Sequence, residues 1–295
     1  MISIVISSAN KTLLARVTLN ISATIGVPYE LISIDNSNGA MGICEVYNLG
    51  AEQARYQTIC YMHEDILLHT KDWGVEVMRV FSNHPDVGIV GVAGGAYKPY
   101  APSGWAGISY ESKTIFTNYL QTDKAGLHPP VAHQVNIGDG HPADVVCVDG
   151  MWFCTRRDLA LSYPFDSELL KGFHGYDIDF CLTVGQHKRV VVCFSILLEH
   201  FSNGGYSKSW LSDTLKVHDK WGKILPRSIL PLSERNRQLI EMRSYKWLVA
   251  KMTEMGYSIA YITAFLYPYF TKGRVTVKQF FKLIYYAMRY QFKSA

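Results

Sequence analysis

Two neighbouring carboxylates follow the apolar segment 58–62, in the sequence His63-Glu64-Asp65. An apolar, β-prone run that ends in acidic residues is typical of a buried strand whose carboxyl end delivers acid groups to a cleft. Ligands of open α/β sheets bind just outside these strand ends. Carboxylates at such a position suit a hard divalent cation, which commonly carries a diphosphate. A solvated strand-to-loop junction would have the same pattern, so the other motifs must distinguish the two interpretations.

Asp35 and Asn36 follow the second expected strand, residues 30–34. A carboxylate at this position commonly hydrogen-bonds a ribose or a base, although Asp and Asn are also good turn formers. Asp177 and Asp179 are two residues apart, so they point in different directions if a helix begins there. One can then face a cleft while the other caps the helix, or both can serve as caps.

His200 follows the apolar segment 190–198 and precedes the glycine pair of residues 204–205. A neutral imidazole at this position could complete a metal site, although a single His is more often structural.

Periodicity predicts the elements that would position these residues. An alternation of strands and helices over the first third of the chain favours a right-handed, mostly parallel sheet with nucleotide-binding geometry. Strands are expected at residues 2–7, 30–34, 58–62 and 87–92, and helices at 13–25, 43–56 and 72–82. Residues 93–143 break this rhythm and are rich in Gly, Pro, Tyr and His, which predicts an irregular, substrate-facing loop or lid. Further strands are expected at 145–148, 151–154 and 190–197, a short helix at 176–184, and helices from about residue 207 onward.

Charge divides the chain into two parts. Residues 1–200 hold 13 Lys/Arg and 20 Asp/Glu, a net of −7, whereas residues 201–295 hold 16 and 5, a net of +11. This asymmetry indicates an acidic body and a basic segment that meets an anionic partner.

Six scattered cysteines without metal-like spacing indicate reduced core residues of a cytosolic protein. The N-terminal residues lack the features of a signal peptide, and the longest uncharged run, 255–271, is too short to span a membrane.

The order of these motifs resembles the family 2 glycosyltransferases, which have a GT-A fold. The resemblance covers roughly residues 2–205. Five segments carry it: Ile32-Ser33-Ile34-Asp35-Asn36-Ser37, Asn48-Leu49-Gly50 with Ala54-Arg55, Met62-His63-Glu64-Asp65, Val148-Asp149-Gly150-Met151-Trp152-Phe153 with Arg156-Arg157, and Phe165-Asp166-Ser167-Glu168 followed by Gly175-Tyr176-Asp177-Ile178-Asp179. It implies an α/β, Rossmann-like GT-A domain over residues 1–206, with a helical, basic and aromatic-rich extension over 207–295.

The resemblance also implies an inverting sugar transfer that depends on Mn²⁺ or Mg²⁺ and uses a nucleotide-diphosphate sugar, with UDP favoured. Its expected residues are Asp177 as catalytic base; Ser7, Asp35, Asn36 and Glu64 as donor contacts; Gly150, Trp152 and Tyr176 as acceptor contacts; and Asp65 and His200 as metal ligands. Two residues depart from the family pattern. His63 replaces the first acid of the D-x-D motif, and Tyr176 replaces the acidic neighbour of the base.

The acceptor is expected to be a glycan or a lipid-linked glycan, in surface polysaccharide synthesis on the cytoplasmic side of a membrane. For the basic segment, contact with an anionic membrane and packing in a homo-oligomer are about equally favoured, and nucleic acid is not expected.

A nucleotidyltransferase would need a glycine-rich phosphate loop after the first strand, where Ser7-Ser8-Ala9-Asn10-Lys11 has none. A non-catalytic GT-A protein that binds a nucleotide sugar or serves as a scaffold is the remaining alternative, because His63 and Tyr176 depart from the family pattern.

Overall fold

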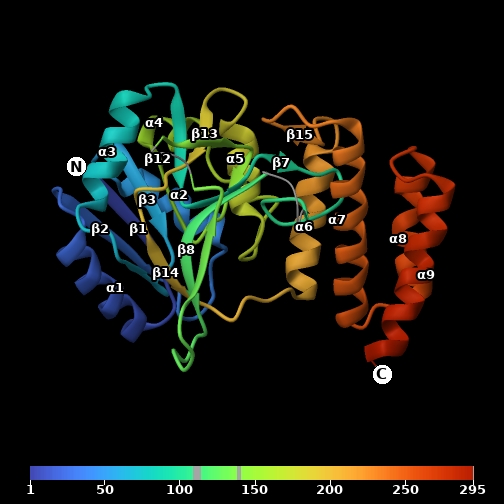
Figure 1. Cartoon of the computed structure of the whole chain (residues 1–295). Coiled ribbons are helices and arrows are strands. Elements are labelled where there is room, and N and C mark those ends of the chain that lie inside the picture. The colour runs from blue at the N-terminus through green and yellow to red at the C-terminus, as the bar shows by residue number, and fades with distance from the viewer. Residues whose placement is uncertain (109–113, 138–140, 295) are drawn as a thin grey trace.

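A computed structural model describes residues 1–108, 114–137 and 141–294 of the chain (Figure 1). Strands and helices alternate through its first part as the sequence predicts. In chain order these are β1 (Ile2–Ser8), α1 (Lys11–Thr24), β2 (Tyr29–Asp35), α2 (Ile43–Gln53), β3 (Thr58–Met62), β4 (Ile66–Leu68), α3 (Trp73–Asn83) and β5 (Val87–Gly91). The remaining strands and short helices are β6 (Ala93–Gly95), β7 (Tyr97–Lys98), β8 (Ile115–Thr122), β9 (Val131–Val135), β10 (Ala143–Val145), β11 (Cys147–Val148), β12 (Trp152–Arg156), α4 (Arg157–Ser162), α5 (Tyr176–Val184), β13 (Arg189–Val192) and β14 (Leu198–Phe201).

The central sheet has the strand order β10-β13-β5-β12-β3-β1-β2, which confirms the α/β architecture. The sheet is mixed. β1 runs parallel to both β2 and β3, and β13 runs parallel to β5. β12 lies antiparallel between β3 and β5, and β10 is antiparallel to β13. The carboxyl ends of β1, β2 and β3 therefore meet at one edge, which is where the polar motifs were expected to converge.

Alternating side chains of the strands build two apolar layers. Val5 and Tyr61 belong to the cluster that packs with α2, α4 and α5, whereas Ile4 and Cys60 belong to the cluster that packs with α1 and α3. This two-residue alternation is what a sheet with both faces covered requires. A close contact fixes α2 on its face, because a Cβ atom on Gly50 would lie 2.3 Å from Cγ1 of Val5.

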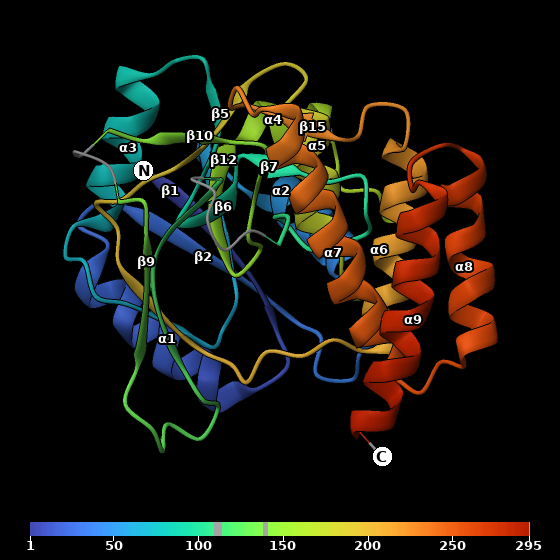
Figure 2. The ribbon, with the colours of Figure 1, turned by 45° about the vertical axis from the view of Figure 1, so that its right-hand side comes forward.

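Residues 93–143 differ from the prediction of an irregular loop or lid. From this segment, β6 and β8 join a second sheet with the order β11-β6-β8-β14-β4, and β9 pairs with β8 as a hairpin (Figure 2). Backbone hydrogen bonds to neighbouring strands therefore replace the expected irregular conformation. Residues 109–113 and 138–140 of the predicted loop lie outside the described residues.

The C-terminal part is helical, as predicted from the sequence. It consists of α6 (Lys208–Trp221), α7 (Glu234–Glu254), α8 (Ile259–Thr271) and α9 (Val277–Ser294), with the short strand β15 (Arg227–Ser228) paired to β7. α8 and α9 lie farthest from the central sheet (Figure 1). Residues of α6, α7, α8 and α9 form an apolar cluster that is separate from the two clusters of the central sheet. Within the described residues, no helix has both the length and the apolar character needed to cross a membrane. The division after residue 206 stays a prediction.

Candidate functional site

A cavity of about 540 Å³ opens where β1 and β3 end. Its lining includes five residues that the sequence singled out: Ser7, Asn36, His63, Glu64 and Asp65. It also includes Lys124, Phe173 and Phe201, which sequence reasoning did not name as site residues. The cavity has the mixed apolar and polar lining, at the carboxyl end of a sheet, that small-molecule sites commonly have.

Three potential metal ligands meet at this cavity: His63 and Asp65 line it, and His200, which is not among the lining residues, lies beside Asp65. Nδ1 of His63 lies 3.8 Å from Oδ1 of Asp65, and Nε2 of His200 lies 3.6 Å from the same oxygen. The pairing of strands produces this meeting, because β14 runs antiparallel to β4 with His200 opposite Ile66. One potential ligand atom from each of the three residues lies within 4.8 Å of the others. Two imidazoles and a carboxylate around a common point can hold a divalent cation.

Charge and hydrogen bonding around Asp65 fit such an ion. Its Oδ1 is buried and has no hydrogen-bond partner among the described residues. Burial opposes ionisation of this carboxyl, but His200 and His63 hold the pKa of Asp65 below its ordinary value. Burial lowers the pKa of His63, which favours the neutral imidazole that binds metals. The three side chains would therefore provide an anionic oxygen from Asp65 and imidazole nitrogens from His63 and His200 to Mn²⁺ or Mg²⁺.

Asp177 occupies the first turn of α5, after Gly175, whose φ of 81° is in the left-handed region that favours glycine. Its Oδ2 accepts a hydrogen bond from the Gly150 N–H at 3.0 Å, and its Oδ1 accepts one from the Ile178 N–H at 2.9 Å. Burial, with a smaller contribution from the charge of Asp149, raises the pKa of Asp177 to about 7. A carboxyl with this pKa can take up a proton near neutral pH.

Two of the predicted donor contacts, Glu64 and Asn36, are also held in place by hydrogen bonds within the protein. Glu64 accepts hydrogen bonds from the Ser8 hydroxyl at 2.8 Å and from the backbone N–H groups of Ala9 and Asn10 at 3.1 and 2.9 Å. It therefore holds the loop between β1 and α1 as well as lining the cavity. Asn36 is fixed by two hydrogen bonds with the backbone of Met41.

Asp35 lies outside this cavity lining. Its side chain is exposed and accepts a hydrogen bond from the backbone N–H of Ser37 at 2.9 Å, as a turn former does.

Two expected acceptor contacts lie in the core instead of on a binding surface. Trp152 is fully buried and packs edge-on against Trp73, with ring centroids 5.8 Å apart. Tyr176 is 4% exposed, and its hydroxyl lies 2.9 Å from Nε2 of His63 and 3.0 Å from the Gly150 carbonyl oxygen. Both side chains are buried in this structure, and their role as acceptor contacts stays a prediction. Gly150 contributes backbone groups that hold Tyr176 and Asp177.

Lys124, Phe173 and Phe201, three of the cavity residues that the sequence analysis did not name, were missed for different reasons. Lys124 follows β8 in the segment predicted to be an irregular loop, and no sequence pattern pointed to its place beside the cavity. Phe173 lies between the two glycines of the Asp177 motif, and Phe201 follows His200, so their positions next to chosen residues were a usable signal. The guanidinium carbon of Arg16 lies 4.2 Å from the ring centroid of Phe201, a cation–π contact that fixes this wall of the cavity.

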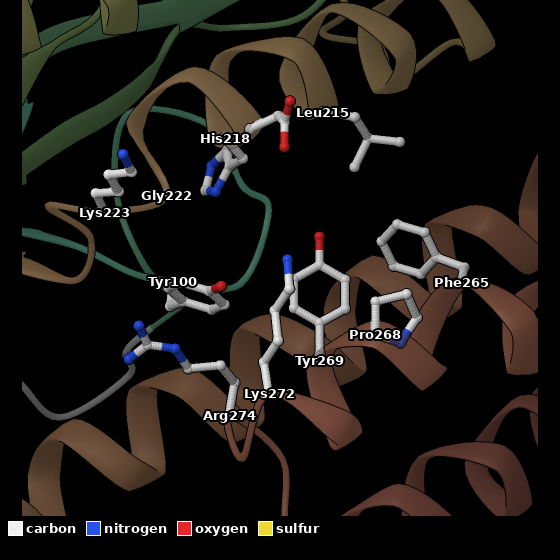
Figure 3. A pocket seen from close by; sticks show the side chains of 11 residues that line it. Tyr100, Leu215, His218, Gly222, Lys223, Phe265, Pro268, Tyr269, Lys272 and Arg274 are labelled. Carbon is white, nitrogen blue, oxygen red and sulfur yellow. The ribbon is translucent and has the colours of Figure 1, made fainter.

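A second cavity of about 670 Å³ lies against the C-terminal helices (Figure 3). Lys223, Lys272 and Arg274 contribute cationic side chains to it, and the guanidinium carbon of Arg274 lies 4.2 Å from the ring centroid of Tyr100. It contains none of the predicted site residues, so volume alone does not identify the site. The 540 Å³ cavity is the better candidate because it holds the converging His and Asp side chains.

Comparison with known proteins identifies the family and the fold. Residues 2–215 match the model of a glycosyltransferase-like family. Among solved structures, GalNAc-T7 with UDP, GalNAc and Mn²⁺ is similar, with a TM-score of 0.50 and 12% sequence identity over 75% of this chain and 48% of that one. This chain thus spans about half the length of that structure. The structure of A197 from STIV matches with a TM-score of 0.38 and 12% identity over 68% of this chain and 86% of that one. No curated protein matches the chain.

The likeness to GalNAc-T7 confirms the GT-A-type α/β fold, and the family match covers the cavity, Asp177 and His200. The chain therefore belongs to the glycosyltransferase-like family.

Proposed function

We propose that the protein is a metal-dependent, inverting glycosyltransferase that uses a nucleotide-diphosphate sugar. The observation that carries this proposal is the convergence of His63, Asp65 and His200 on a cavity at the strand ends. A diphosphate needs compensation of its charge, and a cation held by this set would lie where ligands of α/β sheets bind. GalNAc-T7, a protein of the same fold, is known with UDP and Mn²⁺, which supports UDP-sugars and Mn²⁺ as the first probes.

Asp177 is proposed as the catalytic base. Its carboxylate would remove the proton of the acceptor hydroxyl as that oxygen attacks the anomeric carbon from the face opposite the leaving diphosphate. The N–H groups of Gly150 and Ile178 hold both carboxylate oxygens in place, so the base enters the reaction already oriented. A divalent cation would supply charge stabilisation of the leaving group, so a single protein carboxylate suffices for proton transfer.

The acceptor is proposed to be a glycan or a lipid-linked glycan used in surface polysaccharide synthesis. The basic, aromatic helices after residue 207 support this choice, because such helices can lie on an anionic membrane surface. On this proposal the protein works as a peripheral protein on the cytoplasmic face of a membrane. Self-association through the same helices remains a competing role for them.

Calorimetry and a turnover assay on matched variants test the proposal. We expect UDP-sugar to bind in the presence of Mn²⁺ and to be turned over by the wild-type protein. Asp65→Ala should weaken Mn²⁺-dependent binding of the donor by more than about tenfold, because it removes the only carboxylate of the proposed metal set. Asp177→Asn should keep donor binding and lose transfer. Asp158→Asn, an exposed acidic residue on α4, is the control and should behave as wild type.

Three results would contradict this assignment. Wild-type turnover by Asp177→Asn would exclude it as the base. Unchanged metal-dependent binding by Asp65→Ala would exclude the metal site. Binding of the donor without turnover, across a panel of sugar acceptors, would favour a non-catalytic scaffold of the same fold.

A further inference from the structure

Tyr176 connects two parts of the site that are far apart in the sequence. Its hydroxyl lies 2.9 Å from Nε2 of His63, one of the proposed metal ligands, and 3.0 Å from the carbonyl oxygen of Gly150. The N–H of the same Gly150 donates to Asp177 at 3.0 Å. Hydrogen bonds through Tyr176 and Gly150 therefore connect the proposed metal ligand His63 to the proposed base Asp177.

The chemistry of these groups fixes the direction of each hydrogen bond. A carbonyl oxygen only accepts, so the Tyr176 hydroxyl donates its single proton to Gly150. The hydroxyl can then only accept from His63, which must carry its proton on Nε2. In the neutral ring the other nitrogen, Nδ1, is left with a lone pair. This is the nitrogen that lies 3.8 Å from Oδ1 of Asp65, where the proposed cation would bind.

Packing holds the hydroxyl at this position. The Tyr176 ring meets Tyr47 edge-on, with centroids 5.5 Å apart and an interplanar angle of 86°, and it is tilted against Phe165 at 6.3 Å. Gly150 permits the close approach, because a Cβ atom there would lie 2.2 Å from the Tyr176 hydroxyl oxygen. Because the ring is closely packed, its hydroxyl could change hydrogen-bond partners only if the neighbouring side chains moved.

We propose that Tyr176 is a positioning residue for the metal site. It fixes the tautomer and the orientation of His63, so that the Nδ1 lone pair faces a divalent cation shared with Asp65 and His200. Hydrogen-bond partners behind a metal-binding His commonly have this role. The inference rests on the metal site of the proposed function, but it concerns binding of the ion and can be tested without any sugar transfer.

The test measures Mn²⁺ binding by titration calorimetry and by electron paramagnetic resonance. Tyr176→Phe keeps the ring and removes the hydroxyl, and we expect it to weaken Mn²⁺ binding by about 10- to 100-fold. Tyr61→Phe is the matched control. Tyr61 is also fully buried in the same apolar cluster, and its hydroxyl has no hydrogen-bond partner among the described residues. The control should bind Mn²⁺ as wild type does.

A double-mutant cycle separates positioning from general loosening of the core. In a His63→Asp background the ligand has no N–H to donate, so Tyr176→Phe should change the Mn²⁺ affinity no further. Gly150→Ala, which crowds the hydroxyl without removing it, gives an independent check and should weaken Mn²⁺ binding in the wild-type background. Wild-type affinity in Tyr176→Phe, or an equal loss of affinity in the wild-type and His63→Asp backgrounds, would overturn the inference.

The inference and the proposed function can fail separately. A wild-type protein that binds Mn²⁺ and shows the expected cycle, but transfers no sugar, would overturn the proposed function and leave the role of Tyr176 intact. A wild-type protein that binds no Mn²⁺ would overturn both.

Discussion

Asp177 combines two properties that a general base needs, because its position is fixed and its pKa lies near neutrality. The backbone N–H groups of Gly150 and Ile178 orient the carboxylate, and these hydrogen bonds favour its charged form. Burial and the charge of Asp149 oppose that form more strongly and raise the pKa to about 7. A base with this pKa is both available and basic enough at neutral pH.

This raised pKa predicts how stability depends on pH. The folded protein binds the proton of Asp177 more tightly than the unfolded chain, so the stabilisation is complete below about pH 4 and is lost as pH rises through 7. Relative to Asp177→Asn, the wild-type free energy of unfolding should fall by about 4 kcal/mol between pH 4 and pH 8. Urea unfolding of the metal-free proteins at several pH values measures this. Parallel pH profiles would show that Asp177 has an ordinary pKa.

The individual site residues were predictable to different degrees. Asp65 follows strand β3, and this local pattern was enough to select it as a metal ligand, whereas His63 was noted only as a departure from the family pattern. His200 was a weak candidate from the sequence alone, because its meeting with Asp65 depends on the pairing of β14 with β4 across a long separation in the chain. The hydrogen bond between His63 and Tyr176 could not be predicted at all, since it depends on how β3 and α5 pack in three dimensions.

At the scale of elements, α5 is joined to α6 by an ion pair whose carboxylate is buried and whose lysine is exposed. Asp179 of α5 is 2% exposed, and its Oδ1 lies 2.8 Å from Nζ of Lys220 in α6 and accepts a hydrogen bond from the Trp221 indole at 2.7 Å. The sequence allowed both Asp177 and Asp179 to be helix caps. In the structure their roles differ, because Asp177 accepts hydrogen bonds from the backbone of Gly150 and Ile178, whereas Asp179 attaches the next helix.

Removing this attachment should destabilise the protein. Asp179→Ala leaves the Trp221 indole N–H without its acceptor and removes one partner of Lys220, so we expect the free energy of unfolding to fall by about 2–4 kcal/mol. Chemical denaturation followed by tryptophan fluorescence measures the change. Glu168→Ala is the control, because Glu168 pairs with Lys171 on the surface with a side chain that is 92% exposed, and its loss should leave stability unchanged. Equal effects of the two variants would contradict a special role for Asp179.

The elements themselves were easier to predict where their pattern is local. Helix α5 begins and ends where periodicity placed it, whereas the β8–β9 hairpin was predicted to be an irregular loop. Burial along β8 and β9 does not alternate residue by residue, so neither strand has the two-residue pattern that marks a half-buried strand. Strand β12 was expected from its apolar residues, but its antiparallel direction between β3 and β5 depends on the path of the connections, which local sequence does not encode.

On the scale of the whole molecule, the uneven distribution of charge coincides with an exposed face of α9. Phe281 and Tyr285 are 64% and 57% exposed one helical turn apart, and the exposed Lys278, Lys282 and Arg289 lie on the same helix. Aromatic residues beside basic ones are typical of a helix that lies at the interface of an anionic membrane. Helix α9 lies with α8 on the side of the molecule farthest from the central sheet (Figure 1).

This arrangement predicts binding to anionic vesicles that depends on α9. We expect wild-type protein to float with vesicles containing acidic phospholipid and to be released by high salt, because the basic side chains supply part of the attraction. The double variant Phe281→Ser/Tyr285→Ser should float several-fold less, since it removes exposed apolar area without disturbing the core. Leu19→Ser, which changes a 72% exposed leucine on α1, is the control and should float as wild type does. Unchanged flotation of the double variant would contradict membrane binding by this face. If the wild type does not float and sedimentation shows that the double variant loses dimers, the face would instead serve self-association.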